Sequence, residues 1–155
     1  MSNQKRYKAR EYGEQRIEAL GEKPYLEFEC SDGTIVTIRN QNRLDDDAMG
    51  RFEQLEASLD REPVLDADGR PMFHRQTGEP LTRVARPHRI GGELAEPMVV
   101  LRARALLGER DHKKLLDDGM TSAEIIDAWM SLSKPVGPVE DPDEADGEAP
   151  KGSRS

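Results

Sequence analysis

Residues 26–39, Leu-Glu-Phe-Glu-Cys-Ser-Asp-Gly-Thr-Ile-Val-Thr-Ile-Arg, carry the clearest fold signal in this chain of 155 residues. Leu26, Phe28 and Cys30 alternate with glutamates, which is the two-residue period of a half-buried strand. A second alternating run follows the polar segment at 31–33. This pattern predicts a β-hairpin over residues 25–39.

Two loop lengths fit this hairpin, and they give different registers. A two-residue Asp32-Gly33 turn would place the apolar residues of the first strand on the same face as Arg39. A three-residue loop that ends with Gly33 in the left-handed region aligns them instead with Val36 and Ile38. We predict the second register because it buries more apolar surface and no arginine.

The segments on either side of the hairpin have helical signals. Residues 1–24 are predicted to be a charged helix or arm that Gly21 and Pro24 bring to an end. Its thin apolar stripe consists of Tyr12, Ile17 and Leu20. Acidic side chains stabilise the N-terminus of a helix, so the three aspartates at 45–47 predict the start of a helix over 45–60. The apolar face predicted for that helix consists of Met49, Phe52, Leu55 and Leu59.

A second helical part is predicted over residues 94–133. Pro97 suits the first turn of a helix, and Gly119 suits the end of one. Thr121 and Glu124 have the spacing of a capping box ahead of the apolar residues of the last helix. That last helix is the best-specified element of the chain.

Between the two helical parts, residues 61–92 hold four prolines, four glycines, six arginines and four acidic residues. Turn signals at 66–69 and 76–79 predict an irregular loop or a loose β-hairpin. After residue 133 the sequence is dominated by Pro, Gly, Asp, Glu and Ser, which cannot bury enough apolar surface to fold. Residues 134–155 are therefore predicted to be a disordered acidic tail.

The predicted fold is α+β and mainly helical. It consists of one folded body over residues 25–133, which begins with the β-hairpin and contains the insert at 61–92. Leu, Ile, Val and Phe together make up only about a fifth of the chain, so a small core is expected.

The composition excludes several classes of function. A formal net charge of −8 argues against general nucleic-acid binding, which needs surplus Lys and Arg. A single cysteine rules out an intramolecular disulfide, and no apolar run is long enough to be a signal peptide or to cross a membrane. We expect a cytoplasmic protein with no membrane partner.

No set of residues predicts catalysis, a cofactor or a metal. The motif Asp66-Ala-Asp68-Gly69 lacks the glutamate that a calcium loop requires at its twelfth position, where Thr77 stands. Cys30 has no nucleophile signature around it, and the three histidines lack the spacing of zinc ligands. The sequence therefore indicates a binding protein and not an enzyme.

The order of elements resembles a known family. The acidic strand pair 27–34 leads into Arg39-Asn40 and a charged helix from Leu44, and the motif 115–125 precedes a helix with Trp129 and a tail rich in Pro and acids. This pattern is similar to the small tail-assembly chaperones of long-tailed (siphovirus-type) actinobacterial phages. The resemblance covers roughly residues 26–60 and 94–155.

The resemblance implies a function and its partners. Members of that family shield the long, aggregation-prone tape measure protein, bring tail-tube subunits to it, and are not retained in the virion. Their genes often carry a programmed frameshift near the 3′ end, so this chain would be the shorter, unshifted product. Its longer form, or a second copy, is then a further possible partner.

A chaperone of this kind needs apolar side chains on amphipathic helices. The candidate partner-binding residues are Phe52, Leu55, Leu59, Met98, Leu101, Ile126 and Trp129. The same residues must also supply the core, and the sequence does not divide them between the two roles. Two alternatives stay open: a structural minor tail or connector protein of the virion, and an acidic regulatory adaptor.

Overall fold

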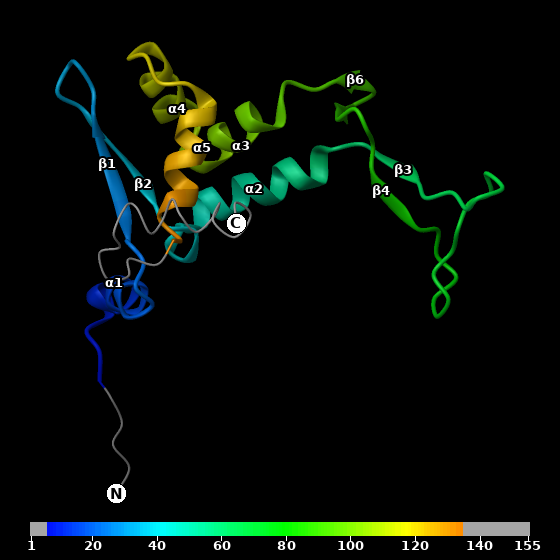
Figure 1. The fold of residues 1–155 in the computed structure, drawn as a ribbon, viewed down its shortest axis with the longest axis horizontal. Coiled ribbons are helices and arrows are strands. Elements are labelled where there is room, and N and C mark those ends of the chain that lie inside the picture. The colour runs from blue at the N-terminus through cyan, green and yellow to red at the C-terminus, as the bar shows by residue number, and fades with distance from the viewer. Residues whose placement is uncertain (1–5, 135–155) are drawn as a thin grey trace, which may run out of the picture.

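The computed structural model describes residues 6–134, which form an α+β fold that is mainly helical (Figure 1). Helix α1 (Ala9–Ala19) precedes the hairpin of β1 (Tyr25–Glu29) and β2 (Ile35–Arg39). A 3₁₀ turn, η1 (Gln41–Arg43), leads into α2 (Asp46–Ser58). Short strands follow, namely β3 (Arg61–Pro63), β4 (Thr82–Val84), β5 (Arg89–Ile90) and β6 (Glu93–Leu94). The described part ends with α3 (Met98–Leu107), α4 (Glu109–Asp117) and α5 (Ser122–Ser131).

The hairpin has the predicted register. Strands β1 and β2 pair antiparallel with Leu26 opposite Ile38 and Phe28 opposite Val36. The three-residue loop closes with a hydrogen bond from the Gly33 N–H to the Cys30 carbonyl, and Gly33 has a φ of 88°. A side chain other than glycine would be strained at that φ, which is why the loop needs glycine there.

One face of the hairpin and the last helices form the main core. Val36 and Ile38 of β2 pack in one cluster with Leu115 of α4 and with Ile125 and Leu132 at the two ends of the α5 segment. Cys30 belongs to the same cluster and is buried, as predicted. Because side chains alternate between the two faces of β2, its inward residues all pack against helices that lie about ninety residues later in the chain.

Three of the predicted helix termini are confirmed, whereas Pro97 precedes the first turn of α3 as its N-cap. The Asp45 carboxylate accepts a hydrogen bond of 2.8 Å from the Ala48 N–H and caps α2. The Thr121 hydroxyl accepts from the Glu124 N–H while the Glu124 carboxylate accepts from the Thr121 N–H, so both bonds of the capping box are present. Gly119, with a φ of 105°, follows the end of α4.

Residues 61–92, which we call the basic arm, form a β-hairpin. Its root is the pairing of β3 with β4, and it extends away from the helices in Figure 1. Single bridges of Leu65 with Pro71 and of Phe73 with Pro80 continue it outward as two turns. Of the two predicted forms, the loose hairpin is the correct one, and both predicted turns are present.

The root of the basic arm is fixed by Asp60. Its carboxylate accepts hydrogen bonds from the Gly91 and Gly92 N–H groups at 3.0 and 2.7 Å. Its backbone N–H donates to the Arg89 carbonyl, and its carbonyl accepts from the Ala85 N–H. One residue therefore joins both sides of the arm where it leaves α2.

Some predicted faces were wrong. Met49 is 51% exposed and Ala48 is buried in its place, because Met49 lies at the edge of the predicted stripe, whose other residues do face inward. Tyr12 and Leu20 of the first predicted helix are exposed, and only Ile17 is buried. The start of the predicted 94–133 helical part also differs, because Glu93 and Leu94 pair as β6 before α3 begins.

The helix predicted within residues 1–24 is shorter than expected, because α1 spans only Ala9–Ala19. Residues 135–155 of the predicted tail lie outside the described residues.

Candidate functional site

An apolar groove lies between α2, β5 and α3. Leu55 of α2, Ile90 of β5 and Leu101 of α3 form its apolar lining, and each is half-buried. The groove has a volume of about 400 Å³ and opens widely to solvent. We call these side chains, with their polar rim, the α2–α3 groove.

The charged rim of the groove is fixed by internal hydrogen bonds. Arg104 donates two hydrogen bonds to the Glu96 carboxylate in a bidentate ion pair, with N–O distances of 2.8 and 2.9 Å. This bond lowers the pKa of the Glu96 carboxyl and raises the pKa of the Arg104 guanidinium. Arg51 donates from Nε to the Ala105 carbonyl at 2.7 Å and so holds the C-terminal turn of α3.

The structure separates the predicted partner-binding residues into two groups. Leu59, Ile126 and Trp129 are buried and belong to the interior. The other four, Phe52, Leu55, Met98 and Leu101, are half-buried. Of these four, Leu55 and Leu101 meet in the α2–α3 groove.

Phe52 lies on a different flank of α2. Its ring stacks on Trp129 at a centroid distance of 5.4 Å and an interplanar angle of 15°. Together with Leu59 and Ala57 it lines a shallow hollow of about 520 Å³ whose other residues are charged. Trp129 does not line this hollow and is buried against Phe52.

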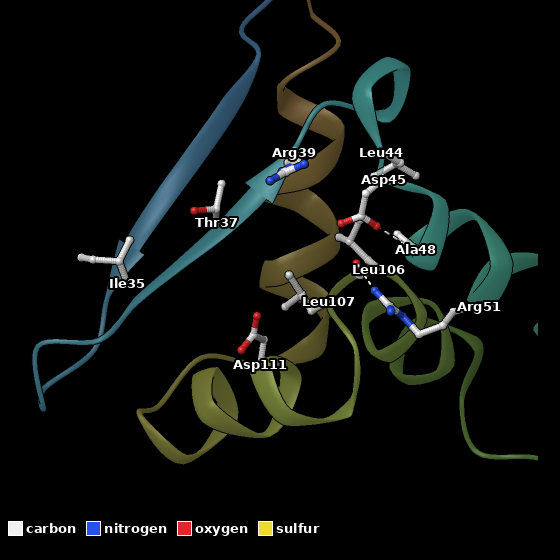
Figure 2. A pocket seen from close by; sticks show the side chains of 10 residues that line it. All are labelled: Ile35, Thr37, Arg39, Leu44, Asp45, Ala48, Arg51, Leu106, Leu107 and Asp111. Carbon is white, nitrogen blue, oxygen red and sulfur yellow. Dashed lines mark hydrogen bonds between the residues drawn. The ribbon is translucent and has the colours of Figure 1, made fainter. Parts of the chain in front are cut away.

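A third hollow lies between the hairpin and the helices (Figure 2). It has a volume of about 220 Å³, and Arg39, Asp45, Arg51 and Asp111 bring charges of both signs to it. Asp45 already caps α2, and Arg51 already binds the end of α3. With those two side chains engaged in structural bonds, this hollow has less capacity to bind a ligand than its charges suggest.

Cys30 and His112, whose residue types often act in catalysis, are both buried. Burial, together with Asp118 and Asp32, raises the pKa of the Cys30 thiol, so the reactive thiolate is disfavoured at neutral pH. His112 is buried, and its Nε2 lies 2.9 Å from the Ser122 hydroxyl. Within residues 6–134, no group of His, Cys, Asp or Glu side chains could hold a metal ion. No helix in that range is long and apolar enough to cross a membrane.

His112 gives a testable pH dependence. Burial is the main cause that lowers the pKa of His112, and Arg104 adds to it while Glu96 opposes it. The unfolded chain, with an ordinary histidine pKa of about 6.5, then binds protons more readily than the folded one. The stability of the fold with neutral His112 is therefore expected to be complete above about pH 6.5. The free energy of unfolding should fall as the pH drops below that value.

Urea unfolding at several pH values between about 7.5 and 5.5 measures this effect, in a range above the usual carboxyl pKa values. The His112→Gln variant should have a flatter dependence on pH, whereas the exposed His74→Gln control should follow the wild type. An equal slope for wild type and His112→Gln would contradict the assignment.

Comparison with protein-family models, curated proteins and solved structures finds no significant match. The role of the groove is therefore inferred from its own residues alone. Sequence reasoning missed Ile90, which comes from a segment without a clear apolar period, and Arg51, which is a charged residue next to the predicted apolar face of α2. The signal available for Ile90 was its position just before Gly91-Gly92, where a turn places it near the end of α2.

Proposed function

We propose that this protein is a tail-assembly chaperone of a long-tailed phage and binds an apolar helix of the tape measure protein in the α2–α3 groove. The observation that carries the proposal is the pair of half-buried leucines, Leu55 and Leu101, which two helices present to solvent in one groove. The resemblance of the sequence to that chaperone family supports the choice of partner.

The physical requirements of such a chaperone agree with these features. An amphipathic helix binds a groove through apolar side chains spaced at i, i+3, i+4 and i+7. The groove offers leucines to such a stripe, and Gln54 and Glu109 offer polar contacts at its edge. A net charge of −8 keeps a complex with an aggregation-prone partner in solution.

The Leu55→Glu variant tests the groove. Placing a carboxylate among its apolar side chains is expected to cost about 2 kcal/mol or more of binding free energy, which is roughly a thirtyfold loss of affinity. Co-expression with the tape measure protein, followed by measurement of its soluble yield and by pull-down, checks this. Met130→Glu on α5 is the matched control, since Met130 is exposed and outside the groove.

Two outcomes would contradict the proposal. If wild-type protein does not raise the soluble yield of the tape measure protein, the chaperone function is wrong. If Leu55→Glu and Met130→Glu bind equally well, the groove is not the binding surface. Circular dichroism of both variants establishes that each is folded before the comparison.

Mass spectrometry of purified phage particles separates a chaperone from a minor tail or connector protein. We expect this chain to be absent from the particles, and its presence in fixed copy number would favour the structural alternative. Mixing with the tail-tube protein tests the second proposed partner. Under the same proposal, infected cells should also contain a longer product that shares this chain's N-terminal peptides, as a frameshift would produce.

A further inference from the structure

The basic arm carries a cationic surface that has no partner within the body. Figure 1 shows the arm extending away from the helices, and nearly all of its side chains from residue 65 to residue 80 are exposed. It contains six arginines in a protein whose net charge is −8. Such a surface attracts an anionic segment over a distance of about 10 Å at moderate salt.

Two of the six arginines are engaged within the arm. Arg83 forms an ion pair with Glu62 at 2.9 Å, and Arg61 donates to the Thr82 hydroxyl and carbonyl across the β3–β4 pair. Among residues 6–134, no carboxylate lies within ion-pair distance of the remaining four. These four, which we call the arm arginines, are Arg70, Arg75, Arg86 and Arg89.

The same chain contains a segment of matching charge. Residues 140–148, Glu-Asp-Pro-Asp-Glu-Ala-Asp-Gly-Glu, hold six carboxylates and no cation. The segment begins a few residues after α5, and the fourteen residues from 135 to 148 span at most about 50 Å when extended. Because the segment belongs to the same chain, its binding to the arm is intramolecular, and weak ion pairs are enough to hold it wherever this length spans the distance.

We propose that the acidic segment, residues 140–148, binds the arm arginines of its own chain. The arm supplies donors that match carboxylates in geometry, because each guanidinium can bind two oxygens at once. Exposed Phe73 and Met72 beside Arg70 and Arg75 add apolar contact for the alanine and proline of the segment. An external anionic partner of the arm would then have to displace this segment first.

A nucleic-acid backbone is the main competing occupant. It would have to approach a protein of net charge −8 from solution, whereas the acidic segment is present at one copy per arm and cannot diffuse away. The inference does not depend on the proposed chaperone function, since it concerns a different surface.

Nuclear magnetic resonance of the full chain tests the proposal. In the tail variant, all six carboxylates of residues 140–148 are replaced by their amides (Glu→Gln and Asp→Asn). The backbone amide signals of the arm around the arm arginines are expected to shift relative to wild type, while those of α3 and α5 stay in place. About 1 M NaCl, which shortens the Debye length to ~3 Å, should produce the same arm shifts in wild type.

The matched control replaces Lys151 and Arg154 with Gln and should leave the arm signals unchanged. The proposal is overturned if the tail variant and wild type give the same arm signals. It is also overturned if the shifts vanish on dilution, because the segment would then come from another copy. Arm signals that respond to an added DNA duplex, but not to the tail variant, would assign the arm to nucleic acid instead.

Discussion

Replacing Trp129 with alanine is expected to lower the free energy of unfolding by about 3–5 kcal/mol, which is a large part of the ~5–15 kcal/mol that holds a small domain together. Trp129 is 8% exposed and lies in the core cluster with Ile125 and Leu132. Its ring also stacks on Phe52, and the Arg102 guanidinium lies 5.8 Å above it. The substitution therefore removes a large buried volume together with two aromatic contacts.

Urea unfolding followed by far-ultraviolet circular dichroism measures this loss, since the variant has no tryptophan left for fluorescence. Met130→Ala is the control because it changes the next residue of the same helix, whose side chain is 57% exposed. That control should stay within about 0.5 kcal/mol of wild type. Equal losses for the two variants would mean that Trp129 does not contribute to the core as described.

The Trp129→Phe variant separates the contribution of the aromatic ring to stability from that of its polar N–H group. The Trp129 Nε1 is buried and has no hydrogen-bond partner among the described residues. Phenylalanine removes this unsatisfied donor, whose burial costs about 1–3 kcal/mol, and keeps an aromatic ring against Phe52. We therefore expect Trp129→Phe to be much less destabilising than Trp129→Ala.

The position of Trp129 on its helix could be predicted from the sequence, but its packing partner could not. Helical spacing placed Ile126 and Trp129 on an apolar face, but spacing alone does not say whether such a face meets another helix or solvent. The structure answers this through Phe52 of α2, which is 77 residues earlier in the chain. Contacts of that kind depend on tertiary packing and have no local signature.

The features that were predicted correctly are those with a local physical cause. The register of the hairpin followed from counting which residues each loop length would bury, and the capping box followed from a fixed spacing of Thr121 and Glu124. Met49 was misplaced because an apolar residue at the edge of a stripe can fall on either side of it. The α2–α3 groove itself was not predicted, because Leu55 and Leu101 were only separate candidates and Ile90 enters from the root of the basic arm.

Asn40 is expected to be the most sensitive polar position in the described part of the chain. It is fully buried at the end of β2, and its Nδ2 lies 3.0–3.1 Å from the Leu132 carbonyl, the Lys23 carbonyl and the Glu22 carboxylate. Its Oδ1 accepts from the Asn42 N–H at 2.8 Å. One side chain thus joins the segment after α1, the hairpin and the end of α5.

Asn40→Ala should lower the free energy of unfolding by about 2–4 kcal/mol. It leaves several acceptors without their hydrogen-bond donor, and each buried unsatisfied group costs about 1–3 kcal/mol. Chemical denaturation measures the loss. Asn42→Ala is the control, since Asn42 is exposed and uses only its backbone N–H in this network. A loss for Asn40→Ala as small as for Asn42→Ala would contradict the role assigned to the buried amide.

Asn40→Asp distinguishes lost donors from lost volume, because the two side chains have nearly the same shape. The introduced carboxylate has no N–H to donate and faces two carbonyl oxygens and the carboxylate of Glu22. Burial and these negative neighbours would raise its pKa in the folded state above the ordinary value of about 3.9. The folded variant then binds a proton more readily than its unfolded chain, so its deficit relative to wild type should shrink as the pH falls toward 5. If Asn40→Asp is as stable as wild type at neutral pH, the cavity left by alanine, and not the buried hydrogen-bond network, sets the cost at this position.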